Sequence, residues 1–117
     1  MPHVVLNGIV NIDDILKKFN SIVIRNEYGI FKTNNVYINR DKTALLIESL
    51  AIEKGVKNSF LTMISLRDDG VVVRIYPGLE VEKTNGVKKI LSEIAKQILT
   101  MFPQLTIGET NLLEYLK

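Results

Sequence analysis

The 117-residue chain contains no cysteine and no tryptophan, and its only histidine is His3. Without cysteine the chain cannot form a disulfide, a thiolate nucleophile or a cysteine-ligated metal site. One histidine near the N-terminus does not supply a histidine-built metal site or a catalytic triad within one chain. The sequence therefore predicts no metal ligands, no cofactor and no catalytic residues. A non-enzyme is favoured over an active site assembled from Asp, Glu, Lys, Tyr and Ser.

Long apolar runs and a strong charge of one sign are missing as well. No run reaches the roughly 18 residues that span a bilayer, and the N-terminus lacks the pattern of a signal peptide. We therefore expect a cytoplasmic protein without membrane contact. The net charge of +2 is too small to predict nucleic-acid binding by itself. The length fits a single domain over residues 1–117, and the Ile-, Lys- and Asn-rich composition suggests an archaeal or thermophilic origin.

Three apolar runs, at residues 43–52, 59–66 and 71–76, are the most informative feature present. Short polar turns that contain glycine separate them, and such turns leave no room for a crossover, so the runs predict an antiparallel meander. Asp69-Gly70 is the strongest turn signal, typical of a type I′ hairpin. Residues 43–54 also fit a helix that ends before Gly55. A helix would place Leu46 beside the polar stripe, so we prefer a strand there.

Two helices accompany the meander in the predicted fold. Asn11 caps a short helix over 12–19, and an apolar stripe marks a long helix over 86–102 that ends before Pro103. The remaining expected elements are strands over 3–10 and 21–25, short strand pieces at 30–32 and 36–38, and a short docking helix over 110–117. We expect an α+β fold: an antiparallel meander sheet of about five strands, with the long helix packed on one face and the short helix after the first strand.

The expected order of elements has two resemblances in topology. Strand, helix, meander and helix in this order is similar to half of a TATA-binding protein. The likeness concerns the order alone, and no motif carries DNA binding over to this chain. With residues 43–54 as a helix, the order resembles the roadblock or longin-like adaptor folds, which associate through paired elements.

The Asp69-Gly70 turn divides the meander into two faces. With these two residues as the loop, Leu66 opposes Val73 and Ile64 opposes Ile75, and opposed residues share a face. The face predicted to carry the long helix is formed by Phe60, Ile64, Leu66, Val71, Val73 and Ile75. The second face carries Leu61, Met63, Ser65, Arg67, Val72, Arg74 and Tyr76. If Lys54-Gly55 is also a two-residue turn, Leu46, Glu48 and Leu50 join this second face.

The second face mixes large apolar groups with arginine, tyrosine and methionine, which are enriched at interfaces. Its interface candidates are Leu61, Met63, Arg67, Val72, Arg74 and Tyr76. We predict a non-enzymatic interaction or assembly module, a homo-oligomer or a small subunit of a complex. Alternatively, the C-terminal segment or the first helix covers this face internally and Arg74 extends to its edge. Another alternative is a single-stranded nucleic-acid binder that uses Tyr76, Arg74 and Arg67.

Two further motifs are better explained by structure than by function. The acidic stretch 67–70 lacks the alternate spacing of a calcium loop and fits a hairpin turn. Thr84-Asn85-Gly86 precedes the long helix and could bind an anion, but it also fits ordinary helix capping.

Overall fold

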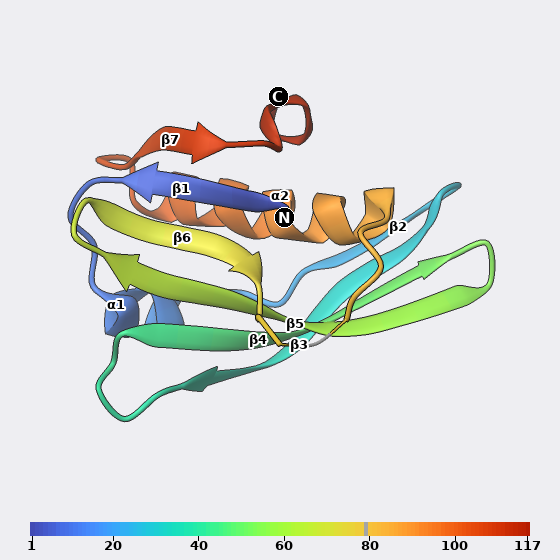
Figure 1. Cartoon of the computed structure of the whole chain (residues 1–117), viewed down its shortest axis with the longest axis horizontal. Helices are drawn as coiled ribbons and strands as arrows, with labels where there is room; N and C mark the ends of the chain where they lie inside the picture. Colours follow the sequence, from blue (N-terminus) through green and yellow to red (C-terminus); the bar gives the residue numbers. More distant parts are fainter. Residues whose placement is uncertain (79) are drawn as a thin grey trace.

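A computed structural model of the protein describes residues 1–78 and 80–117. Within these residues one antiparallel sheet has seven strands in the order β2-β3-β4-β5-β6-β1-β7 (Figure 1). The strands are β1 His3–Asn7, β2 Val23–Asn26, β3 Gly29–Ile38, β4 Ala44–Glu53, β5 Val56–Arg67, β6 Gly70–Ile75 and β7 Thr106–Thr110. The helices are α1 Ile12–Lys18, α2 Asn85–Met101 and the 3-10 turn η1 Leu113–Leu116. No helix in the described ranges is long and apolar enough to cross a membrane.

The structure confirms a mixed α+β fold with an antiparallel sheet and corrects its details. The expected pieces at 30–32 and 36–38 are one strand, β3, whose register shifts between Thr33 and Val36 where Asn34-Asn35 interrupt the pairing. The five-residue strand β7 was not expected, and it ends at Thr110, where a helix over 110–117 was predicted; only η1 is helical in that segment. β7 pairs with β1 at the edge of the sheet, so about five predicted strands become seven among the described residues.

Residues 43–54 form a strand, as preferred, and not a helix. The burial of β4 alternates along its length, with Leu45, Ile47, Ser49 and Ala51 on the buried side. The turn after β4 is a two-residue loop, because Glu53 pairs with Val56 around Lys54 and Gly55. Lys54 and Gly55 have φ angles of 51° and 77°, the positive pair that a type I′ turn requires. This turn places Leu46, Glu48 and Leu50 on one face of the sheet with Met63 and Leu61.

The predicted loop at Asp69-Gly70 is wrong by one position. Arg67 pairs with Gly70, so the loop residues are Asp68 and Asp69, and Leu66 opposes Val71 rather than Val73. Neither aspartate has a positive φ, so the turn is not of type I′. A Cβ at Gly70 would collide with the carbonyl oxygen of Leu6. Glycine is therefore required at position 70 because β1 lies so close to it. This contact joins segments that are distant in sequence, so the local sequence around the turn does not reveal it.

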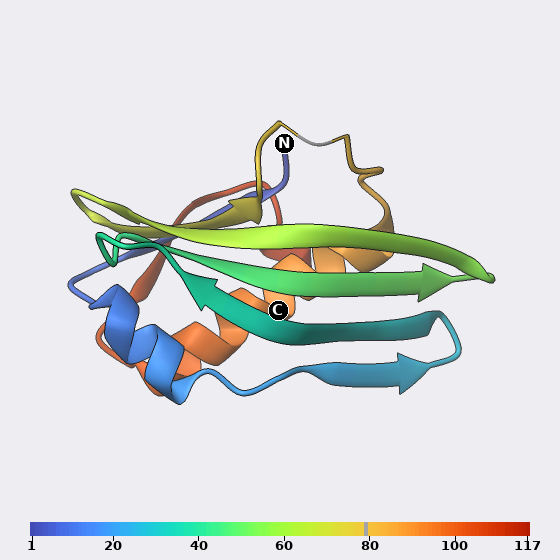
Figure 2. The same cartoon turned by 90° about the horizontal axis from the view of Figure 1, so that it is seen from below.

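The main core lies between the sheet and α2. Figure 2 shows α1 and α2 on the same side of the central strands, with the sheet curling around α2. The buried stripe of α2 includes Val87, Ile90, Leu91, Ile94 and Ile98, and it joins one cluster with residues of β1, β3, β4, β5 and β6. The capped helix α1 adds Ile12 and Ile15 to the same cluster.

The sheet face under α2 differs from the purely apolar face expected. Leu66 was expected to contact the long helix, but it lies at the end of β5 and is 46% exposed. Two hydroxyls are buried in the middle of this face, and the Oγ atoms of Ser49 and Thr62 hydrogen-bond to each other at 2.9 Å. The Ser49 hydroxyl also contacts the Ile47 carbonyl oxygen at 3.0 Å. Since each hydroxyl has a partner, the two polar groups are accommodated in the core.

Candidate functional site

The second side of the sheet, opposite α2, is here called the open face. On its central strands β4, β5 and β6 it carries Leu46, Glu48, Leu50, Leu61, Met63, Ser65, Val72 and Arg74. Strand pairing arranges these residues in rows. One row runs from Arg74 through Met63 and Leu46 to Tyr37, and the next contains Leu61 and Glu48. Residues in one row point the same way and contact their neighbours across strands. The open face is therefore a defined surface with known neighbours.

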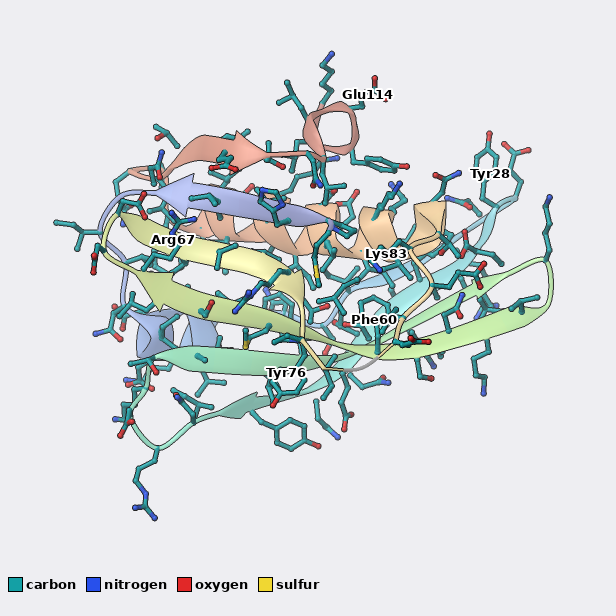
Figure 3. All side chains as sticks on the ribbon, viewed as in Figure 1. Tyr28, Phe60, Arg67, Tyr76, Lys83 and Glu114 are labelled. Atoms are coloured by element: carbon teal, nitrogen blue, oxygen red, sulfur yellow. The ribbon has the colours of Figure 1, made fainter. Side chains whose placement is uncertain are left out.

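The structure gathers five of the six interface candidates and separates Arg67 from them. Leu61, Met63, Val72 and Arg74 are neighbours in the middle of β5 and β6. Arg67 lies near the β5–β6 turn, where its Nε is 3.2 Å from a carboxylate oxygen of Asp69. Tyr76 comes directly after β6 (Figure 3), and its amide donates to the Leu61 carbonyl oxygen at 2.8 Å, so it lies beside Leu61. Of the expected set, only Arg67 thus lies away from the others, at the turn between β5 and β6.

Arg74 is the most unusual side chain of the open face. Its Nε is buried and has no hydrogen-bond partner among the described residues. Its cross-strand neighbours are His3 on β1 and Met63 on β5, and Met63 is only 9% exposed. A buried donor without an acceptor costs about 1–3 kcal/mol, and a charged one costs more. An acceptor supplied by a binding partner would remove this cost.

The opposite charge on the open face belongs to Glu48, two strands away from Arg74. The Tyr37 hydroxyl donates to Glu48 Oε2 at 2.8 Å, and the Asn35 amide donates to Oε1 at 3.3 Å. The bond to Glu48, which favours the protonated phenol, raises the pKa of Tyr37. A carboxylate accepts several hydrogen bonds, so Glu48 has capacity for a further donor. Sequence analysis missed Tyr37 as part of the site, although the Val36-Tyr37-Ile38 alternation could have shown it.

The segments that were considered as internal covers lie on the other side of the sheet. Ile12 and Ile15 of α1, and Leu112 before η1, all belong to the core cluster with α2. The connection between β6 and α2, described at residues 76–78 and 80–84, instead lies on the open-face side of the sheet, away from the helices (Figure 2). Arg74, Leu61 and Leu46 remain half-buried, and Tyr37 is 50% exposed.

Two of the hollows formed by the described residues bear on the candidate sites. The larger, about 830 Å³, lies between the β2–β3 turn, the start of α2 and Tyr115. Its main polar groups bind within the chain: Glu53 accepts from the Gly86 amide at 2.9 Å and from the Thr84 hydroxyl at 2.6 Å. Lys89 pairs with Glu93 at 3.2 Å. Thr84-Asn85-Gly86 is thus a capping segment whose anion is Glu53.

The smaller hollow, about 380 Å³, lies beside Glu48 on the open face. Leu50, Leu61, Ser59 and Asn34 are among its lining residues. It is large enough for a side chain of another molecule, and it adjoins the one carboxylate among the central open-face residues. No group of three or more His, Asp or Glu residues within 1–78 and 80–117 is placed to hold a metal ion.

Comparisons with known protein-family models, with curated proteins and with solved structures found no match to this chain. The likeness to half of a TATA-binding protein therefore rests on the order of elements alone. The geometry of the open face is the basis for any functional conclusion.

Proposed function

We propose that the protein is a non-enzymatic assembly module that self-associates through its open face. The observation that carries the proposal is the buried Nε of Arg74, which lacks an acceptor within the described chain and lies beside apolar Met63. A partner on this face would bury Leu46 and Leu61 further and supply the acceptor. Arginine, methionine and tyrosine are enriched at interfaces, and arginine and tyrosine are among the residue types that carry most of the binding energy.

A second copy of the chain is favoured as the partner because the open face carries both charges. Arg74 lies on β6 and Glu48 on β4, on either side of the apolar residues Leu61 and Met63 of β5. A surface with separated opposite charges around an apolar centre can complement itself in a two-fold dimer. A partner with only acidic groups would leave Glu48 facing like charge.

Single-stranded nucleic-acid binding has less support from the geometry. Glu48 places a carboxylate within the surface that phosphates would approach, and Asp69 already pairs with Arg67. Arg67 pairs with the first residue of β6 and Tyr76 follows the last one (Figure 3), so these two residues do not form one stacking platform. Binding that weakens steeply with salt would be required for this alternative.

Thiol protection tests the proposal, because the natural chain contains no cysteine. Ser65→Cys places a thiol on the open face, and Thr100→Cys places a control thiol on the exposed side of α2. We expect the maleimide reaction at position 65 to slow as protein concentration rises, while the reaction at position 100 stays constant. A rate at position 65 that is independent of concentration would contradict self-association through this face.

A further inference from the structure

We infer that self-association has one register, in which Arg74 of each subunit pairs with the partner's Glu48. This inference rests on the proposed function and adds the orientation and the charge pair that hold the two copies together. It follows from the rows of the open face, where Arg74, Met63 and Leu46 are directly opposed and Glu48 opposes Leu61 in the next row.

The register follows from a two-fold axis that lies between the two sheets and runs along β5. Because β4 and β6 flank β5, this rotation places β5 over its own copy and β6 over the partner's β4. Arg74 then lies over the row of the partner's Leu46, and the partner's Glu48 is two residues further along, about 7 Å at strand spacing. An arginine side chain spans this distance, and the symmetry forms the pair twice.

The other axis that aligns the strands gives no such pair. A two-fold axis across the strands places β6 over the partner's β6, so Arg74 would face the partner's Arg74 and Val72. That arrangement brings like charges together and leaves the buried Nε without an acceptor. Only the axis along β5 lets the carboxylate of the partner's Glu48 reach the Arg74 guanidinium, in the charge-assisted geometry that arginine favours.

The apolar centre fits the same axis. Leu61 and Met63 lie on β5 itself, so each faces the same strand of the second copy near the axis. The two charge pairs then flank this centre, one on each side. The hollow of about 380 Å³ lies on the other side of Glu48, next to Leu50 and Ser59, and leaves space beside the carboxylate.

Mixing two charge variants tests the register. In the Arg74→Glu chain, positions 48 and 74 are both acidic. In the Glu48→Arg chain, the same two positions are both basic. Each variant alone should lose self-association by roughly a hundredfold or more, since an unpaired charge remains buried. Mixed one to one, the variants should form a heterodimer, because both pairs are restored. Arg67→Glu mixed with Glu48→Arg is the control for general charge attraction, and far-UV circular dichroism confirms that each variant is folded.

The outcomes separate the register from the proposed function. A heterodimer from Arg74→Glu and Glu48→Arg, with none from the control mixture, supports the pair. If each single variant is monomeric and the mixture stays monomeric, the register is wrong while the open face remains the interface. If both single variants self-associate as strongly as the natural chain, the inference and the proposed function are both overturned.

Discussion

At the scale of single residues, a hydrogen bond between Glu48 and Tyr37 on the open face changes the pKa of the tyrosine. The phenol donates to the carboxylate at 2.8 Å, and this bond raises the pKa of Tyr37 above its usual value of 10.0. Since the folded pKa is raised, the stabilisation from the bond is present below pH 10 and is lost as pH rises through the folded pKa. The Tyr37 phenol therefore stays protonated and able to donate throughout the neutral pH range.

Glu48→Gln should return the pKa of Tyr37 toward about 10. The neutral amide still accepts a hydrogen bond, but it no longer opposes formation of the phenolate. The measurement is an absorbance titration of tyrosinate at a concentration where the chain is monomeric. A parallel titration of Tyr37→Phe separates this group from the other three tyrosines. An unchanged pKa in Glu48→Gln would disprove the role of the carboxylate.

Gly70→Ala should be among the most destabilising single-methyl changes in the chain. Gly70 has a φ of 154°, and the added Cβ would meet the Leu6 backbone. We expect a loss of about 3 kcal/mol or more in the free energy of unfolding, from backbone strain and displacement of β1. The matched control is Gly55→Ala, where φ is 77° but no atom lies within 4 Å. That control should cost about 1–2 kcal/mol, so equal losses in urea unfolding would contradict the collision with β1.

At the scale of elements, Glu53 connects the end of β4 to the start of α2. Its carboxylate accepts from the Gly86 amide and the Thr84 hydroxyl, while Thr84 itself accepts from the Val87 amide at 3.2 Å. Negative charge at a helix N-terminus is favourable. The long helix is therefore fixed to the sheet at its first turn by a polar contact as well as by its apolar stripe.

Glu53→Ala should lower the free energy of unfolding by about 2 kcal/mol, because two donors lose a charged acceptor. Glu53→Gln keeps one acceptor oxygen and should lose less. Glu114→Ala, at an exposed position of η1 (Figure 3), should change stability by no more than about 0.5 kcal/mol. Urea unfolding compares the three variants, and a Glu53→Ala loss no larger than that of Glu114→Ala would refute the connection.

The elements that sequence predicts well are those with a local cause. The stripe of α2 and the alternation of β4 identify both elements, and Lys54-Gly55 identifies its turn. β7 was missed because a five-residue edge strand with Gly108 in its middle has no local pattern and forms only where β1 is available. The 67–70 turn was misplaced because glycine is needed at position 70 to avoid a collision with the backbone of Leu6, which is distant in sequence.

At the scale of the whole molecule, the division into two faces was predictable despite the register error. Leu66 pairs with Val71 and not with Val73 as predicted, so the register differs by two residues. Side chains on a strand alternate between the two faces with a period of two. The same residues therefore share a face in both registers. The rows were not predictable, because the position of Arg74 relative to Glu48 depends on the pairing of three strands. Arg67 and Tyr76 were included for their residue type, and the structure places Arg67 at the start of β6 and Tyr76 beside Leu61 after its end.

Self-association through the open face is the central claim, and the mass of the species that the chain forms in solution tests it most directly. Sedimentation equilibrium should give twice the chain mass of 13.2 kDa for the natural protein as its concentration rises. Arg74→Glu should remain at 13.2 kDa, while Arg40→Glu, the same charge change in an exposed turn, should behave as the natural protein does. A natural chain of 13.2 kDa at every concentration would contradict the account.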